Sequence, residues 1–402
     1  MKIGKAAFIL FFTACFFLHP GFVHAEKESD QKPDGETKKD SSILKTVEDI
    51  KGKLSISGDF RGRLENDFNR DATTDTRTRG RIRFRLGLDF PVNDDVTVGA
   101  RFATGPLADP NSPHATFTGA FDRPNFSLDR AFVRWIPSFF EEMTLWLGKF
   151  GHPFATPVVY PELVWDQDVQ PEGGAVGFTF RDLGIVKKLN VVNGSYILLE
   201  QDPGSEAWMN GSQVATTFQF ASKLELTAAT GFYYYSNVNA GAPGADAIVR
   251  NDNGGNTAMD NDGDGTADSF VSGFRILDSF MDAAYTGLPM PLAFQAQYLH
   301  NFGANAARND GYAFGIAYGQ LKKQWDWRAY YQYQRVQQDA VFSPFSQDDF
   351  LRQTNFKGHL LGIALAVYKN VDLHAWGLID ELDSAPGGNQ QVRSRVDLNV
   401  KF

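Results

Sequence analysis

Five arginines between residues 77 and 85 occupy every second position, and this spacing restricts the fold more than any other feature of the sequence. They are Arg77, Arg79, Arg81, Arg83 and Arg85. Apolar side chains take the alternate positions from Ile82 to Phe90. A helix turns by about 100° per residue and would scatter both sets around its axis. A β-strand places alternate residues on opposite faces. The segment therefore predicts a strand with one basic and one apolar face.

The same alternation recurs along the chain and predicts about sixteen strands. We place them at 53–66, 77–91, 94–106, 126–137, 142–151, 174–182, 186–200, 211–221, 222–236, 270–286, 290–303, 310–322, 324–338, 356–368, 370–382 and 390–402. These lengths suit tilted membrane strands of about 9–11 residues better than soluble strands of about 5–6. Short and long connections alternate, as in outer-membrane barrels. We expect an all-β fold, a transmembrane antiparallel up-and-down β-barrel.

Composition excludes several other classes of protein. The net charge is −9 and the mean hydropathy is −0.30. Beyond the first 25 residues, no apolar run approaches the ~20 residues of a membrane helix. One cysteine excludes a disulfide scaffold. The acidic balance, with no basic domain, excludes a nucleic-acid partner. A barrel remains, because its polar and apolar faces average to a moderate hydropathy.

The N-terminal residues have the pattern of an export signal. Lys2 and Lys5 precede an apolar run, and Val23-His-Ala25 resembles a cleavage site, so residues 1–25 read as a signal peptide. Residues 26–52 form a charged periplasmic tail, whose apolar spacing from Ile43 to Ile50 fits a short helix or a linker equally well. The barrel then spans residues 53–402, in the bacterial outer membrane.

The last strand ends on an aromatic residue. Val396, Leu398, Val400 and Phe402 share one face of the segment, and polar residues take the other. A terminal aromatic residue on such a strand resembles the signal that the barrel-assembly machinery reads in bacterial outer-membrane proteins. Aromatic residues near other predicted strand ends, such as the run 232–235, suit the girdles that flank the lipid-facing band.

Five segments resemble the Gram-negative "putative porin" family. They are Arg81-Ile-Arg-Phe-Arg-Leu-Gly-Leu, Asp94 to Gly105, Leu128 to Trp135, Leu147 to Phe154 and Val164 to Asp168. The resemblance covers about residues 77–180. It implies an outer-membrane channel. More distantly, the chain resembles the general and phosphate-selective porins, whose sixteen-stranded barrels are usually trimers, so the resemblance implies a homotrimer.

The polar strand faces would line a lumen that is too wide for side chains to fill. The predicted lining residues are Arg61, Arg63, Arg77, Arg79, Arg81, Arg83, Arg85, Arg101, Arg130, Arg134, Arg393 and Arg395. Closure of the last strand on the first would bring Arg393 and Arg395 beside Arg61 and Arg63. In the alternative interpretation, the arginines only pair with Asp59, Glu65 and Asp89 and make the wall rigid.

The third long connection carries acidic residues that could face this wall. They are Glu162, Asp166, Asp168 and Glu172. In general porins the third outer loop folds into the lumen, and the resemblance implies the same here. We expect a constriction with a basic wall on one side and an acidic loop on the other. Its transverse field would favour polar over apolar solutes.

A second acidic segment lies in the long connection 237–269. Asp260, Asp262, Asp264 and Asp268 alternate with small residues in the pattern D-x-D-x-D-G-x-x-D, and Asn251, Asp252 and Asn253 could add ligands. Such an oxygen cage suits Ca²⁺, although the glutamate at position 12 of an EF-hand is missing. The alternative is a solvated surface loop. We expect no required cofactor.

We therefore expect an outer-membrane porin for passive diffusion of small polar or anionic solutes, in contact with outer-membrane lipid. The alternative is a receptor, an adhesin or a scaffold barrel that displays a Ca²⁺-stabilised surface loop. An enzyme is disfavoured, because the sequence holds neither an H-E-x-x-H nor a G-x-S-x-G motif.

Overall fold

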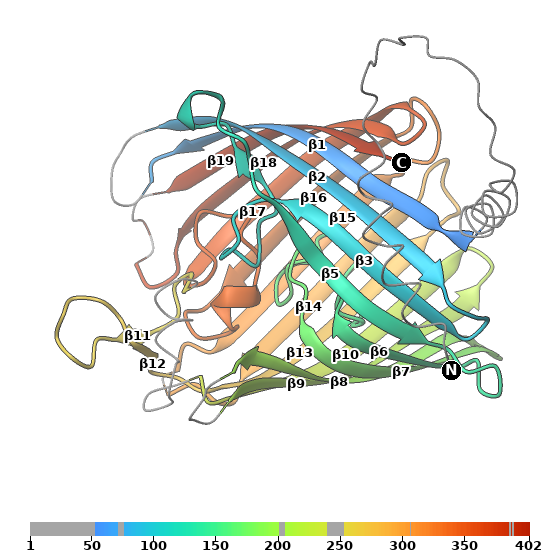
Figure 1. Ribbon diagram of the computed structural model, residues 1–402. Coiled ribbons are helices and arrows are strands. Elements are labelled where there is room, and N and C mark those ends of the chain that lie inside the picture. The colour runs from blue at the N-terminus through green and yellow to red at the C-terminus, as the bar shows by residue number, and fades with distance from the viewer. Residues whose placement is uncertain are drawn as a thin grey trace, which may run out of the picture. The chain divides into compact units, whose positions relative to one another are not determined.

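Sixteen long strands form a closed antiparallel barrel in the computed structural model (Figure 1). The structure describes residues 53–70, 76–200, 206–238, 253–305, 307–385, 387 and 390–402. The predicted signal peptide, the tail 26–52, Asn251 and Asp252 lie outside the described residues. The division of the chain into these three parts stays a prediction.

The strands follow the order of the chain around the barrel. The sixteen strands are β1 (Ser55–Phe68), β2 (Arg77–Pro91), β3 (Val96–Thr104), β5 (Phe126–Trp135), β6 (Met143–Lys149), β7 (Glu172–Leu183), β8 (Val186–Leu199), β9 (Ala207–Ala221), β10 (Leu224–Ser236), β13 (Phe274–Tyr285), β14 (Leu292–Asn301), β15 (Asp310–Gly319), β16 (Trp327–Val336), β17 (Phe356–Tyr368), β18 (Val371–Leu382) and β19 (Gln391–Lys401). Each pairs with its neighbours in this order, and β1 pairs with β19 to close the ring. The predicted fold class and strand number are confirmed.

Two-residue strands and 3-10 turns lie in the longer connections. β4 (Ala115–Thr116) pairs with β2, and β11 (Ala258–Met259) pairs with β12 (Ser269–Phe270) in a separate hairpin. Two 3-10 turns, η1 (Gly119–Phe121) and η2 (Ser343–Phe345), complete the elements of the described residues. Among those residues, no helix has the length and the apolar composition required to cross a membrane.

The burial of side chains is the inverse of that in a soluble protein. On β1, Leu64 is 51% exposed, whereas the neighbouring Glu65 is fully buried. On β14, Phe294 is 49% exposed and Gln295 only 3%. Since exposed apolar side chains are favourable only against an apolar medium, this arrangement fits a wall that faces lipid and encloses a polar interior.

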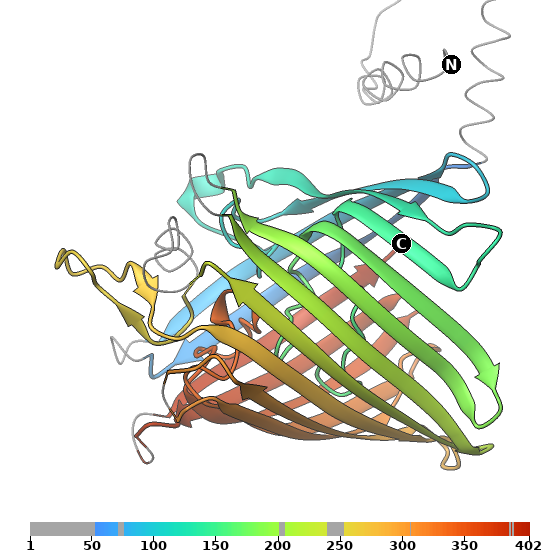
Figure 2. The ribbon, with the colours of Figure 1, turned by 90° about the horizontal axis from the view of Figure 1, so that it is seen from below.

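Two long connections fold into the barrel rather than away from it. They are the segment 150–171, between β6 and β7, and the segment 337–355, between β16 and β17. We call them the first inner loop and the second inner loop. Figures 1 and 2 show both inside the ring of strands. The opposite end of the barrel carries short turns, such as 184–185 between β7 and β8.

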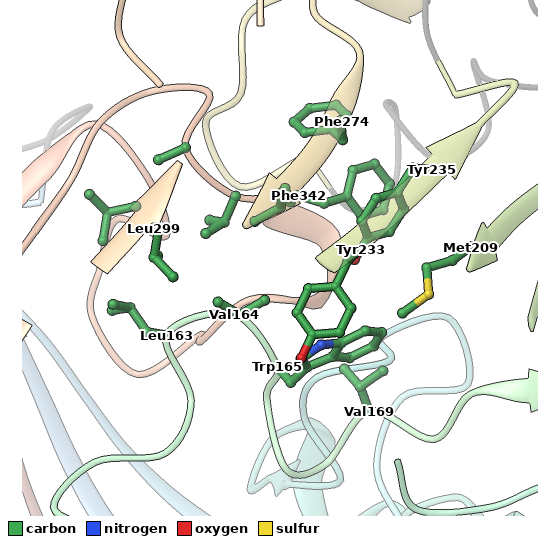
Figure 3. Close-up of a cluster of buried hydrophobic side chains, with 14 of the residues drawn as sticks. Leu163, Val164, Trp165, Val169, Met209, Tyr233, Tyr235, Phe274, Leu299 and Phe342 are labelled. Carbon is green, nitrogen blue, oxygen red and sulfur yellow. The ribbon is translucent and has the colours of Figure 1, made fainter. Parts of the chain in front are cut away.

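The apolar core of the protein lies where these two loops meet the inner wall (Figure 3). Phe342 of the second inner loop packs on Tyr235 of β10 with a ring-centroid distance of 4.5 Å, and Trp165 of the first lies 5.6 Å from Tyr233. Tyr233 and Tyr235 thus point inward, so only their neighbours Phe232 and Tyr234 remain exposed on the outer face. The two inner loops therefore make the lumen narrower than it would be in an empty barrel of sixteen strands.

Candidate constriction site

The first inner loop crosses the lumen from one wall to the other. Gln213 on β9, Gln295 on β14 and Arg328 on β16 form hydrogen bonds with its backbone at 2.6, 2.8 and 3.0 Å. On the opposite wall, Asp168 of the loop forms an ion pair of 2.6 Å with Arg85 on β2. These contacts connect the first inner loop to four strands, so the loop crosses the interior of the barrel.

Asp168 connects the loop to the basic wall. Its carboxylate accepts hydrogen bonds from Nη1 of Arg83 at 3.3 Å and from Nη1 of Arg85 at 2.6 Å. Behind the two guanidinium groups, Asp59 accepts from their Nε atoms at 3.0 and 2.7 Å. Two cations therefore share two carboxylates, one fixed in the wall and one carried by the loop. Asp59 also fits the alternative of a rigid, internally neutralised wall.

The second inner loop adds acidic groups that the sequence analysis did not assign to the site. Asp349 forms an ion pair with Arg395 of β19 and accepts a hydrogen bond from the hydroxyl of Tyr160 at 2.9 Å. The backbone N–H of Asp166 donates to the carbonyl of Phe345 at 2.9 Å. The signal was in the sequence: a loop that carries several phenylalanines is unlike a solvated surface loop.

The register at the closure of the barrel places acids opposite arginines. Glu65 lies opposite Arg395 and Asp67 opposite Arg393. Arg393 and Arg395 are therefore not directly opposite Arg61 and Arg63. Arg395 and Arg63 still lie near each other on the inner face, as the sequence analysis expected, since their guanidinium groups are 4.7 and 5.3 Å from the ring centre of Trp376. Glu65 is fully buried and also forms an ion pair with Arg79, and Asp397 pairs with Arg63 at 2.8 Å. Such cross-strand opposite-charge pairs stabilise a sheet, where like charges would destabilise it.

The other predicted lining residues lie at different heights on the wall. Arg61 donates to Asn399 at 2.7 Å, and Arg81 donates to the hydroxyl of Ser112 at 2.9 Å. Arg77 is exposed at the loop end of β2. It lies opposite Asp67 of β1.

β3 and β5 supply three further arginines. Arg101 forms an ion pair with Asp129, and Arg130 donates to Gln170 of the first inner loop at 2.6 Å. Arg134 lies near the short-turn end of β5, where it pairs with Trp146 of β6. The structure thus brings Arg130 to the loop and leaves Arg134 beyond it.

Glu172 does not belong to the constriction. It is the first residue of β7, its side chain is 63% exposed, and it forms an ion pair of 2.6 Å with Lys149 of β6. The strand begins two residues earlier than the predicted bound at 174, so Glu172 lies on the sheet and not on the inner loop. The predicted set reduces to Glu162, Asp166 and Asp168.

Arginines keep two of the loop carboxyl groups ionised. Burial alone would raise the pKa of Asp168, but Arg83 and Arg85 outweigh it and hold the pKa below its ordinary value. Burial acts in the same way on Asp349, yet Arg395 lowers the pKa of Asp349 to about 2. Both groups therefore meet the wall as carboxylates.

Two neighbouring carboxyl groups behave in the opposite way. Burial raises the pKa of Glu162 well above its ordinary value, and the charge of Asp349 raises it further. Burial, followed by the charge of Glu162, raises the pKa of Asp166. These shifts favour the protonated forms. The negative charge of the first inner loop is therefore concentrated at Asp168.

Cavities lie on both sides of the pair between Asp168 and the wall. One, of about 430 Å³, is lined by Asp168 together with Trp165 and Tyr196. The other, of about 250 Å³, is lined by Arg83 and by residues of the short-turn end such as Leu321. Asp168 faces the first cavity and its partner Arg83 the second, so the ion pair separates them.

The acidic segment lies at the tip of the β11–β12 hairpin, away from the constriction. Asp260 accepts hydrogen bonds from the backbone N–H groups of Gly263 and Gly265 at 2.7 and 2.8 Å. Carboxylate oxygens of Asp260, Asp262 and Asp268 lie within 4.8 Å of one another. Asp264 instead accepts from the N–H of Thr266.

Calcium binding at this hairpin stays a prediction. Three carboxylate oxygens at this spacing are fewer than the six to eight ligands that Ca²⁺ takes, so water would complete the shell. We expect calorimetry to detect binding in the range of about 10⁻⁴–10⁻³ M, typical of extracellular modules. Replacement of Asp260 and Asp262 by asparagine should abolish the heat signal. If the unchanged barrel releases no heat with CaCl₂, the segment is only a solvated loop.

The comparisons with known proteins identify the family. The sequence model of the family described as "Putative porin" matches residues 67–264 and 281–402. The chain belongs to this family. No curated protein matches the chain in sequence. As a member of the family, the protein is an outer-membrane porin channel, and the family and fold indicate a channel rather than an enzyme.

Solved structures of bacterial porins share the fold. Pseudomonas putida OprB superposes with a TM-score of 0.57 and 11% identity, over 90% of this chain and 97% of that chain. Salmonella typhi OmpF, solved in complex with daunomycin, gives a TM-score of 0.50 and 14% identity, over 87% and 97% of the two chains. At these identities the likeness concerns the barrel alone.

Proposed function

We propose that this porin passes small polar and anionic solutes by passive diffusion through a water-containing lumen. One observation carries the proposal: the ion pairs of Asp168 with Arg83 and Arg85 lie between two cavities, one lined by loop-end residues such as Asp109 and the other by short-turn-end residues such as Leu321. A solute on this path meets charged side chains at the narrowest part. Such a site favours polar solutes, because they can replace the contacts that they disturb.

The field across the constriction follows from the two sides that form it. The wall of β1, β2 and β19 contributes guanidinium groups, and the inner loops contribute Asp168 and Asp349. Field lines between opposite charges in a narrow, low-dielectric passage are focused across it. A solute with a dipole or a negative charge is oriented by this field, whereas an apolar solute gains nothing.

The route of the protein to the membrane is part of the same proposal. Residues 1–25 direct export, and the short-turn end of the barrel then faces the periplasm. Phe402 is recognised by the barrel-assembly machinery, and outer-membrane lipid covers the exposed apolar band. That band includes Leu64 and Phe294.

We also infer a homotrimer. β6 has only seven residues, fewer than the ~9–11 that a tilted strand needs to cross the bilayer. Its outward Leu147 is 60% exposed. A second copy of the chain packed against β6, where the wall is too short to span the bilayer, would shield this part of the barrel from the hydrophobic mismatch with lipid.

A receptor or scaffold barrel is the second candidate, and the two loops inside the lumen favour it. The two inner loops bring a packed aromatic cluster into the space where an open pore holds water. Planar-bilayer recordings separate the two candidates, because a porin passes ions without a partner and a plugged barrel does not.

The proposed selectivity is tested by removing three wall charges. Arg81, Arg83 and Arg85 are replaced by serine, and the reversal potential is measured in a KCl gradient. Because two positive charges leave the constriction and a third leaves the wall beside it, we expect a shift toward cation selectivity. Arg77→Ser, at the exposed end of the same strand, is the control and should leave the potential unchanged. An unchanged potential in the triple variant would show that these arginines only make the wall rigid.

A further inference from the structure

The carboxylate of Asp168 sits in a site that is built from the wall. Each of its oxygens is held by a different arginine: Oδ2 by Arg83 at 3.3 Å and Oδ1 by Arg85 at 2.6 Å. Asp59 fixes both guanidinium groups from the other side. The geometry of the two donors therefore depends on the wall and not on Asp168, so the site persists if Asp168 leaves.

The charge balance requires an anion at this position. Arg83 and Arg85 carry two positive charges, and Asp59 neutralises one of them. Arg61 lies close enough to Arg83 for the two like charges to interact, which adds to the positive potential. Without Asp168, one positive charge would remain uncompensated at the boundary of the two cavities.

The side chain of Asp168 can leave Arg83 and Arg85 without a movement of the loop backbone. Its backbone N–H donates to Asp166 at 2.7 Å, and its carbonyl accepts from the side chain of Gln170 at 2.9 Å. These bonds hold the backbone, whereas the side chain is 14% exposed and borders the larger cavity. A rotation about the side-chain bonds alone would free the two arginines.

We propose that Arg83 and Arg85 form a binding site for small carboxylates, and that Asp168 is a tethered occupant which a passing solute displaces. The inference deepens the proposed function and rests on it. A carboxylate offers two coplanar oxygens, one for each guanidinium. Chloride is a single atom that both guanidinium groups would have to share, whereas a carboxylate gives each of them its own oxygen, as Asp168 does. The site therefore favours carboxylates by shape as well as by charge.

Because Asp168 is attached to the loop, it competes with a solute for the two arginines, and this competition sets the concentration at which the solute binds. A short tether gives an effective concentration on the order of millimolar or more. A free carboxylate must match this value, so the channel binds its solute weakly and releases it on the far side. Weak binding of this kind is what conduction requires.

The test measures acetate binding to the folded, detergent-solubilised protein by calorimetry, with NaCl used to hold the ionic strength constant. Asp168→Ala removes the competitor and should tighten acetate binding at least about tenfold, because two charge-assisted hydrogen bonds become available. Asp168→Asn keeps the shape of the side chain and should give a smaller gain. Asp129→Ala is the matched control, since Asp129 also lines the larger cavity but pairs with Arg101. It should leave acetate affinity within about twofold.

The gain must depend on the arginines. In the double variant Asp168→Ala with Arg85→Gln, the tighter binding should disappear. If Asp168→Ala binds acetate no better than the unchanged protein, or if Asp129→Ala gains as much, the inference is wrong. Conductance of the unchanged protein tests the proposed function separately: a barrel that binds acetate but passes no ions overturns the channel and not the site.

Discussion

Replacing Arg395 by methionine is expected to lower the free energy of unfolding of the barrel by about 3–5 kcal/mol. The side chain of Arg395 is fully buried and forms an ion pair of 2.5 Å with Glu65 and another with Asp349. Its guanidinium group also lies 4.7 Å from the ring centre of Trp376. Methionine keeps most of the volume but leaves two buried carboxylates without their main counter-charge, which is the costly case for buried charges.

Urea unfolding of the lipid-reconstituted protein measures this loss. Arg77→Met is the control, because it makes the same chemical change at an exposed position of β2 and should stay within about 0.5 kcal/mol. Single-channel recordings add a second readout. The second inner loop loses an attachment to the wall, so it should move out of the lumen more often and the channel should show more frequent open states. A variant as stable as the control would show that the other arginines around Glu65 compensate fully.

The strands could be predicted from the sequence because their signal is local. The alternation of polar and apolar residues needs only neighbouring positions, and β17 begins at Phe356 and ends at Tyr368 as predicted. The Arg segment was likewise placed as β2, from Arg77 to Pro91. A wall between lipid and a polar interior enforces this period on every strand.

The pairing at the closure could not be predicted with the same accuracy. A shift of two residues leaves every side chain on its own face, so alternation alone does not fix which inward residues are opposite. The observed register sets Arg395 against Glu65 and Arg393 against Asp67. The sequence analysis placed these arginines beside Arg61 and Arg63 without assigning the directly opposite residues, and the two acids that separate the like charges in the structure were therefore not identified as their partners.

The path of the inner loops was the least accessible part of the site. For the first inner loop, the resemblance to porins supplied the inward fold, and acidic residues indicated its direction. For the second, the observed position depends on contacts that are distant in sequence, such as Asp349 with Arg395 and with Tyr160. Its phenylalanines were a sign of burial, but a pattern without a period does not say against what they pack.

Replacing residues 342–350 by a short glycine-serine linker is expected to raise single-channel conductance several-fold. This part of the second inner loop carries Phe342 and Phe350, both almost fully buried, and Asp349. Its removal would clear space in a lumen that sixteen strands make wide enough for water. Asp339 stays in place and keeps its hydrogen bond of 2.8 Å with Ser272, so the entry to the loop remains anchored.

The matched control removes residues 261–267 from the tip of the β11–β12 hairpin. This change has a similar length but lies outside the lumen, so conductance should stay the same. Equal conductance in the 342–350 variant and the unchanged protein would mean that ions follow the wall past Asp168 without meeting the second inner loop. An increase in both variants would instead point to a general loosening of the loop end. Only an increase confined to the 342–350 variant makes this loop a second element of the constriction, which then has two acidic segments opposite one basic wall.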